Sequence, residues 1–273
     1  MTTSSSALKY AAFCGLSLLA CSAEALPLLP VQNLTFSNYT GFAPKTLFSA
    51  VNPLYWYRGT PGPFGDLVSI DAPGTATINS QAHGNAYPVY GPFSDPPSGG
   101  NFIQADGNPD YESSFNQDIS GLVIGDTYEL SFWQAAGQQQ EFTGATTEQW
   151  VVALGAVGSV LNVQLSGGSG TYFDTDPLAD VQLSTLMSTP SGGVSPWQQV
   201  TMSFTATAVD QTLSFLAWGD NGSTTNLPPT VFLAGVNTPS VPEPATLSLF
   251  GIGVLGLAAS KMSRRAKHRA SGV

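Results

Sequence analysis

Residues 127–134 read TYELSFWQ, and this stretch decides the fold class. Tyr128, Leu130 and Phe132 alternate with other residues, so in an extended strand they all point to one face. Glycine and aspartate form turns between such segments, as in GLVIGDT at residues 121–127. The pattern predicts half-buried antiparallel strands packed as two sheets, an all-β sandwich. The same period of two returns along the chain at residues 150–154, 200–206, 213–217 and 231–236.

The composition also favours short strands joined by turns. Among the 273 residues, Gly (29) and Pro (20) are abundant, whereas charged residues make up only 10%. Aromatic residues make up 11%, which gives the chain enough apolar surface to offset the entropy of ordering and excludes a disordered polypeptide. Without the targeting segments expected at the two ends, the length of residues 26–240 suits one large all-β domain or two small ones, and since no proline-rich linker divides the region we expect one domain.

The charge distribution excludes one class of partner. Between Leu26 and Ser240 the only basic residues are Lys45 and Arg58, and they stand against 16 aspartates and glutamates. The region therefore carries a net charge of −14. A surface this acidic repels phosphate backbones, so we expect no binding to nucleic acid. It remains compatible with neutral sugars, with calcium, or simply with solubility outside the cell.

The first 25 residues have the pattern of a signal peptide. Lys9 supplies a positive charge, and residues 10–20 form an apolar stretch that is too short to span a membrane. Ala23 and Ala25 place small residues where a signal peptidase reads them. We expect Sec export and cleavage by signal peptidase after Ala25. An alternative remains open, because LLAC at residues 18–21 resembles a lipobox.

Both cysteines of the chain, Cys14 and Cys21, lie in this leader. In the lipobox alternative, Cys21 carries the lipid and becomes the new N-terminus. Cleavage after Ala25 instead leaves a mature protein without disulfides, thiol nucleophiles or thiolate metal sites.

The C-terminal region combines three features in a fixed order. The motif VPEP (Val241, Pro242, Glu243 and Pro244) precedes an uncharged apolar run that begins at residue 245. The 15 residues from 245 to 259 form a helix of roughly 22 Å, against a bilayer core of about 30 Å, so the predicted transmembrane helix over 245–260 is barely long enough. The basic residues behind it keep that end in the cytoplasm and the main domain in the periplasm. They are Lys261, Arg264, Arg265, Lys267 and Arg269.

Residues 241–269 therefore resemble a PEP-CTERM sorting signal. The resemblance implies that a membrane enzyme, exosortase, recognises Pro-Glu-Pro and removes the tail. It implies a Gram-negative bacterium that makes exopolysaccharide, and a final location at the cell surface or in the extracellular matrix of a biofilm. Pro242 and Pro244 fix φ and disfavour a helix, so the motif stays extended, and Glu243 gives it one charge. The alternative is an ordinary single-span anchor.

The main domain resembles a second family. Residues 101–138 (NFIQADG to WQAAGQ) and 197–236 (WQQVTMSF to VFLAGV) are similar to the jelly-roll, galactose-binding-like modules of PEP-CTERM proteins and plant cell-wall proteins. The resemblance implies a jelly-roll sandwich and a non-catalytic protein that binds carbohydrate, here an exopolysaccharide. One departure is Ala234, where the family usually has an acidic residue, which weakens a calcium or ligand role for the last strand.

Four aromatic side chains are candidates for stacking on sugar rings. Trp56 and Tyr57 lie between turn residues, while Trp133 and Trp218 have the non-core parity of their strands. The alternative is that these side chains cover sheet edges or fill the second face of a sheet. We predict that the other two tryptophans, Trp150 and Trp197, lie in the core.

Two acidic clusters are weak candidates for calcium, because oxygen ligands at a spacing of two residues suit Ca²⁺. The alternative is solvated turn carboxylates. Neither a histidine zinc site nor a catalytic triad is indicated, because the chain has only His83 and His268. We therefore expect no cofactor and no enzymatic activity, and keep a self-associating structural protein and a glycan-active hydrolase as alternatives. The calcium candidates are Asp106, Asp110, Asp174 and Asp176.

Overall fold

The computed structural model describes residues 25–39, 46–47, 52–78, 87–111, 114–166, 169–219 and 228–238. The predicted signal peptide before Ala25, and the VPEP motif, apolar helix and basic cluster, lie outside these ranges, as does His83. The described residues contain no helix with the length and apolarity that crossing a bilayer requires. They form an all-β structure, which confirms the predicted fold class for the main domain.

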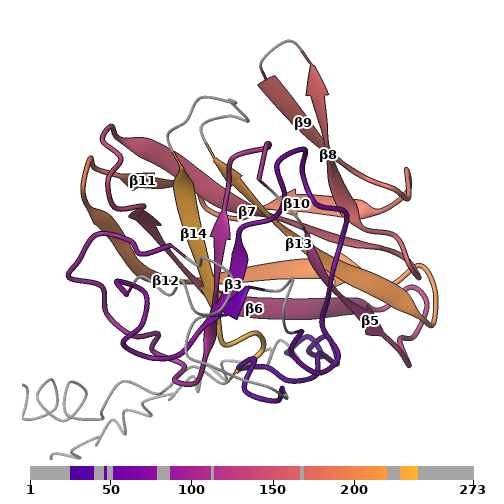
Figure 1. Ribbon diagram of the computed structural model, residues 1–273. Helices are drawn as coiled ribbons and strands as arrows, with labels where there is room; N and C mark the ends of the chain where they lie inside the picture. The colour runs from indigo at the N-terminus through magenta and orange to yellow at the C-terminus, as the bar shows by residue number, and fades with distance from the viewer. Residues whose placement is uncertain are drawn as a thin grey trace, which may run out of the picture.

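The strands form two six-stranded antiparallel sheets and a separate hairpin (Figure 1). Sheet A has the order β1 (Thr46–Leu47), β3 (Val68–Asp71), β4 (Phe102–Asp106), β14 (Pro229–Ala234), β6 (Thr127–Gln138) and β12 (Val194–Thr205). Sheet B has the order β10 (Asp180–Leu183), β7 (Thr146–Ala156), β13 (Gln211–Gly219), β5 (Phe115–Ile119) and β2 (Tyr57–Arg58), with β11 (Met187–Thr189) also paired to β7. The hairpin consists of β8 (Leu161–Ser166) and β9 (Ser169–Asp174).

The strand order is that of a jelly roll. From β4 to β7, and again from β11 to β14, consecutive strands alternate between the sheets, so that β4, β14, β6 and β12 face β5, β13, β7 and β10. The last strand, β14, pairs with both β4 and β6 and therefore lies inside sheet A rather than at its edge. Sheet A is thus incomplete until the final strand of the domain has been added. The resemblance to jelly-roll modules had predicted this topology.

The main core lies between the two sheets. Leu130 and Phe132 of β6 point into it and have no exposed surface, as their alternation predicted. β12 pairs with β6 so that Val200 lies opposite Phe132 and Met202 opposite Leu130. Trp150 lies in the same core with no exposed surface, as predicted. Aromatic rings fill its centre as a continuous chain of contacts. The chain runs from Phe36 through Trp56, Phe115 and Phe215 to Phe132.

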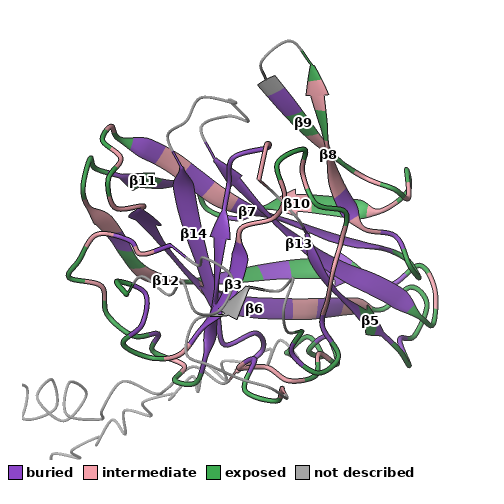
Figure 2. Ribbon diagram, viewed as in Figure 1, coloured by how far each residue is buried: buried purple, intermediate pink, exposed green. Residues whose placement is uncertain are grey.

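The outer faces of both sheets are also covered, which the alternation did not predict. All nine residues of β13 are buried, and so are all six of β14, so these strands have no polar solvent face (Figure 2). On sheet A, residues of the described segments 72–78 and 87–98 cover Phe102 and Phe232. On sheet B, the β8–β9 hairpin covers Leu216 and Trp218. Both are third layers that come from distant parts of the sequence.

Asn237 joins the two ends of the described domain. Its side-chain amide donates to the carbonyl oxygen of Leu29 (2.6 Å) and accepts from the backbone N–H of Ser131 (2.8 Å). Its own backbone N–H donates to the Ser131 carbonyl (2.7 Å). The N-terminal segment and the end of the last strand are therefore fixed to the same part of β6.

Candidate functional site

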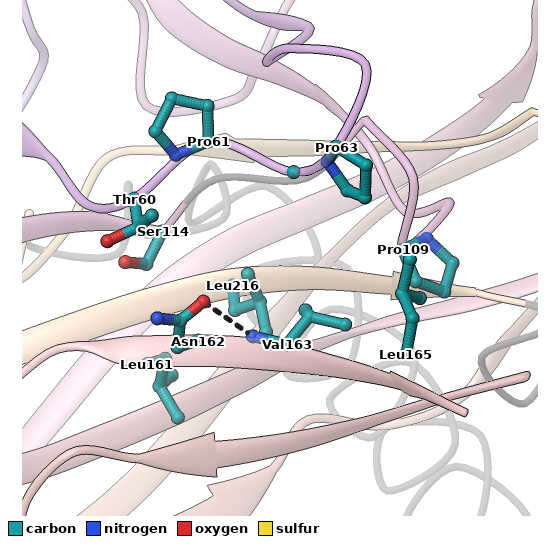
Figure 3. A pocket seen from close by; sticks show the side chains of 11 residues that line it. Thr60, Pro61, Pro63, Pro109, Ser114, Leu161, Asn162, Val163, Leu165 and Leu216 are labelled. Carbon is teal, nitrogen blue, oxygen red and sulfur yellow. Dashed lines mark hydrogen bonds between the residues drawn. The ribbon is translucent and has the colours of Figure 1, made fainter.

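A groove of about 380 Å³ lies on the outer face of sheet B (Figure 3). One wall is the loop after β2, and the other wall is β8 of the projecting hairpin. Leu216 of β13 and Ser114, which directly precedes β5, lie between these walls. The lining consists of Thr60, Pro61, Gly62, Pro63, Pro109, Ser114, Leu161, Asn162, Val163, Leu165 and Leu216.

Two glycines let the walls approach the sheet. Gly59 donates its N–H to the Ser114 carbonyl (2.7 Å), and a Cβ at this position would collide with the Ser114 hydroxyl. On the other side, a Cβ at Gly170 would lie 2.8 Å from the Pro109 ring and 3.3 Å from Trp218. The loop and the hairpin therefore lie closer to sheet B than any side chain at these positions would allow.

The groove is uncharged and mainly apolar. Proline, leucine and valine side chains form most of its surface, and the polar members are Thr60, Ser114 and Asn162. These three gather toward one end in Figure 3, while Pro109 and Leu165 lie toward the other. The Asn162 Oδ1 accepts from the N–H of Val163 (2.8 Å). This bond fixes the side chain and leaves the amide NH₂ group to face outward as a donor.

A row of polar side chains continues from the groove along β5 and β13. Ser214 donates to Asn116 Oδ1 (2.5 Å), and Thr212 donates to Asp118 Oδ1 (2.7 Å). The Tyr57 hydroxyl also donates to Asp118 Oδ1 (2.9 Å). Partial burial, aided by the Asp118 carboxylate, raises the pKa of Tyr57 to about 12. This phenol therefore stays a neutral donor at any physiological pH.

Positive charge is nearly absent from the described surface. Arg58 is the one lysine or arginine within the described ranges. Its guanidinium pairs with the Asp66 carboxylate at 2.5 Å, and Asp66 is largely buried. The described residues thus offer no unpaired cation to hold an anionic sugar.

Two of the four predicted stacking residues, Trp56 and Trp218, are buried in the structure. Trp56 is only 2% exposed and contacts Phe36 and Phe115, with its Nε1 donating to the Gln32 carbonyl (3.2 Å). Trp218 is 6% exposed beneath the hairpin, edge-on to Tyr172. Both expectations are corrected, because a ring packed on protein has no face left for a sugar.

The other aromatic residues keep some exposed surface. Trp133 of β6 and Trp197 of β12 are half-buried on the outer face of sheet A, against the residues that cover it, so the prediction that Trp197 lies in the main core is wrong. The Trp197 Nε1 donates to the Ser94 carbonyl (2.7 Å). Tyr57 is half-buried and lies opposite Asn116 in the pairing of β2 with β5, so the two side chains share one face of sheet B. None of the four predicted residues lines the groove, and the Tyr57 hydroxyl reaches Asp118 on β5.

The candidate calcium ligands act as turn residues. Asp106 is 2% exposed and accepts from the Asn108 N–H (2.8 Å), and Asp110 donates its N–H to the Asn108 side chain. Asp176 accepts from the N–H groups of Ala156 and Leu178. Within the described ranges, no three His, Cys, Asp or Glu side chains are grouped as metal ligands. Calcium binding stays a prediction.

Asp174 is partly buried, and this burial perturbs its titration. Its Oδ1 accepts from the Asp176 N–H (2.7 Å), while Oδ2 is buried without a hydrogen-bond partner. Burial raises the pKa of Asp174, although the Asp176 N–H and the Ser159 hydroxyl partly oppose the shift. The charged form is therefore disfavoured by the fold.

Sequence reasoning missed the groove, because its walls come from three separate segments. A local signal was present in TPGPFG at residues 60–65, where two prolines make a rigid loop. Nothing in the sequence of β8 indicated that it would stand opposite this loop.

Comparison with known families identifies the C-terminal region. Residues 240–265 match the family model described as the PEP-CTERM protein-sorting motif. The chain carries a PEP-CTERM sorting signal. This confirms the prediction made from VPEP, the apolar run and the basic cluster, and it implies export and a membrane-anchored sorting intermediate. The PEP-CTERM match begins two residues after Thr238, the last described residue of the sandwich.

A search of curated proteins finds no match to this chain. Three solved structures illustrate its similarities to known folds. The enzymatically active domain of bacteriophage CBA120 tailspike protein 4 aligns at 11% identity and a TM-score of 0.33, over 67% of this chain and 19% of the other. TmCBM61 in complex with β-1,4-galactotriose aligns at 11% identity and a TM-score of 0.31, over 76% of this chain and 94% of the other.

The third structure holds the CBM22-1 and GH10 modules of Clostridium thermocellum xylanase 10B with xylohexaose. It aligns at 13% identity and a TM-score of 0.31, over 67% of this chain and 25% of the other. This chain thus spans about a fifth of the tailspike domain and a quarter of the xylanase modules.

Proposed function

We propose that this PEP-CTERM protein is sorted by an exosortase-type enzyme to the cell surface or extracellular matrix of a Gram-negative bacterium. There, its jelly-roll domain binds a neutral exopolysaccharide and performs no catalysis. The observation that carries the proposal is the sorting motif at residues 240–265, which directly follows a folded jelly roll. The expected boundaries are a signal peptide over 1–25, the domain over 26–240 and the sorting signal over 241–269.

The groove supports a neutral sugar as the ligand. Its volume of about 380 Å³ lies within the range of roughly 300–1,000 Å³ that is usual for ligand sites. Its lining holds no ionisable side chain, so a uronic acid would lose hydration there without gaining a partner. Sugar C–H faces fit the proline and leucine walls, while sugar hydroxyls fit the side chains of Thr60 and Asn162.

The same lining favours binding over hydrolysis. Glycoside hydrolysis uses two carboxyl groups about 5–9.5 Å apart on either side of the scissile bond. None of the residues that line the groove is an aspartate or a glutamate. The nearest row of polar side chains has one carboxylate, Asp118, which is engaged by Thr212 and Tyr57.

Sorting is tested by intact-mass measurement of the mature protein. Glu243→Ala should keep the tail and leave the protein in the inner membrane, because the enzyme loses the one charge of its recognition motif. Asp210→Ala, at an exposed turn carboxylate, is the matched control and should be processed normally. Identical C-termini in the wild type and Glu243→Ala would refute the sorting proposal.

Sugar binding is tested by titrating the protein with polysaccharide from its own producer. Thr60→Trp should fill the groove and abolish binding, and Asn162→Ala should weaken binding about fivefold through the loss of about one hydrogen bond. Thr201→Trp, at an exposed position of β12, is the control for added bulk. Unchanged affinity in Thr60→Trp would show that the groove is not the binding site.

One observation favours self-association as a second candidate. The edge strand β10 exposes Val181 (37%) and Leu183 (47%), and the neighbouring Leu178 and Leu186 are 86% and 53% exposed. Exposed apolar strand edges are sites of pairing between chains. Sedimentation of the wild type against Leu183→Lys distinguishes this candidate, which requires a concentration-dependent oligomer that the charge disrupts.

A further inference from the structure

The polypeptide leaves the sandwich at a rigid point beside its own N-terminal segment. Asn237 is 5% exposed, and its side chain bridges the carbonyl of Leu29 and the N–H of Ser131. Thr238 follows and caps the turn, with its hydroxyl donating to the Gly235 carbonyl (2.9 Å). The folded domain therefore extends up to Thr238, which is only four residues before Pro242.

Apolar side chains flank this exit point. The segment from Leu26 to Leu29 runs along β6, because Glu129 donates its N–H to Pro27 (2.8 Å) and Leu29 donates to Glu129 (2.9 Å). Leu26 and Leu28 are nevertheless 42% and 49% exposed. We call the surface formed by Leu26–Leu29, Asn237 and Thr238 the exit face.

The short connection forces this face against whatever reads the motif. At about 3.6 Å per extended residue, the Pro242 Cα lies at most about 14 Å from the Thr238 Cα. A domain the size of residues 26–240 has a radius of gyration of about 17 Å. The tether is thus shorter than the domain is wide, so an enzyme that binds Pro242–Pro244 must touch the domain near the exit face.

Charge decides which occupant fits this face. Residues 26–240 carry −14, and a bilayer surface with anionic lipids repels such a domain. The exit face instead offers Leu26, Pro27 and Leu28, which suit an apolar protein surface. The length of the tether and the position where the described chain ends both identify that protein as the one that binds the motif.

We propose that the exit face is a docking surface for the membrane-embedded processing enzyme, which reads the folded domain together with the Pro-Glu-Pro motif. The inference rests on the proposed function, since it assumes that such an enzyme removes the tail. Contact between the two proteins raises the effective concentration of the motif at the enzyme's cleft. Lengthening the tether releases this contact and slows processing, although the motif itself is intact.

The test is a pulse–chase of the full-length chain in its producer, with the rate of tail removal read from the mass of the chain. One variant inserts eight Gly-Ser residues between Thr238 and Pro239. A second is Leu28→Ser, which avoids Leu26 because that residue adjoins the expected signal-peptidase site. The control is Leu178→Ser, at a leucine that is more exposed (86% against 49% for Leu28) and lies in the loop before β10, on the edge of sheet B.

Both the insertion and Leu28→Ser should slow tail removal at least about threefold, while Leu178→Ser should match the wild type. An unchanged or faster rate in either test variant overturns the docking surface; a faster rate after insertion means that the domain obstructs the enzyme. Retention of the tail in the wild type itself would instead refute the proposed sorting function. The two failures are therefore distinguishable.

Discussion

Trp56→Ala should destabilise the sandwich rather than simply remove a sugar contact. The side chain is 2% exposed and packs with Phe36, Phe115 and Phe215 at ring-centroid distances of 5.3, 5.4 and 6.2 Å. Truncation of a buried tryptophan to alanine costs about 3–5 kcal/mol through lost burial and the remaining cavity. Because domains of this kind are stable by only about 5–15 kcal/mol, this is a large fraction of the total.

The expected fall in Tm follows from the size of the domain. At about 2–4 °C per kcal/mol for 150–250 residues, a loss of about 4 kcal/mol lowers Tm by about 8–16 °C. Thermal unfolding followed by near-UV circular dichroism measures Tm. Urea unfolding measures the loss of free energy as a lower urea midpoint at constant slope. Trp133→Ala is the matched variant, and it should cost less because Trp133 is half-buried and lies outside the main core.

The reasoning would be refuted by a Trp56→Ala protein with wild-type stability that has lost polysaccharide binding. That result would mean that the Trp56 ring contacts a ligand in solution and that its packing against Phe36 and Phe115 does little for the fold. A loss of binding that appears only above the lowered Tm would be the expected result, because it follows from unfolding.

Three further predictions concern ionisation and backbone space. Asp174→Asn should raise Tm at pH 7, because the folded state raises the pKa of Asp174 and its charged form opposes folding. The stability that protonated Asp174 contributes is present below its unfolded pKa of about 3.9 and is lost as pH rises through the folded pKa. The Tm difference between variant and wild type should therefore vanish near pH 3 in thermal scans, and its persistence there would contradict the assignment. Tyr57→Phe should reduce the loss of folding stability that the wild type shows between pH 10 and about 12, because the folded pKa of Tyr57 is about 12 and the protonated phenol favours the folded state up to that pH. Urea midpoints at these pH values measure the stability, with Tyr172→Phe as the comparison. Gly59→Ala should weaken ligand binding and destabilise the domain by about 1–3 kcal/mol, because the added Cβ would collide with the Ser114 hydroxyl. Unchanged polysaccharide-binding and unfolding curves would show that the loop lies farther from Ser114.

The inner faces of the strands were predictable from the order of residues. Leu130 and Phe132 reach the core because a strand turns alternate side chains to one side, whatever the rest of the chain does. The outer faces were not predictable in this way. Trp218 and Trp133 have the parity of solvent-facing residues. The β8–β9 hairpin nevertheless buries Trp218, and Trp133 is half-buried against the residues of segments 72–78 and 87–98 that cover sheet A.

The sorting signal and the groove differ in how far they could be predicted from the sequence. The sorting signal is one continuous stretch whose meaning depends on motif, length and charge order, so it was recognisable from the letters alone. The groove was not, because Thr60, Ser114 and Asn162 come from three segments that meet only in the folded domain. None of the predicted stacking residues lines it, and Trp56 contacts core rings instead.

The amino-acid sequence by itself determined an exported, acidic, all-β protein with a PEP-CTERM signal, because periodicity, composition and contiguous motifs are local properties. The tertiary structure alone decided which aromatic rings are buried, where the groove lies and how close the rigid end of the domain stands to the sorting motif. These depend on which distant segments cover each sheet, and on Asn237 holding the two ends together. Pairing between distant segments leaves no periodic trace in the chain, so only the folded molecule shows it.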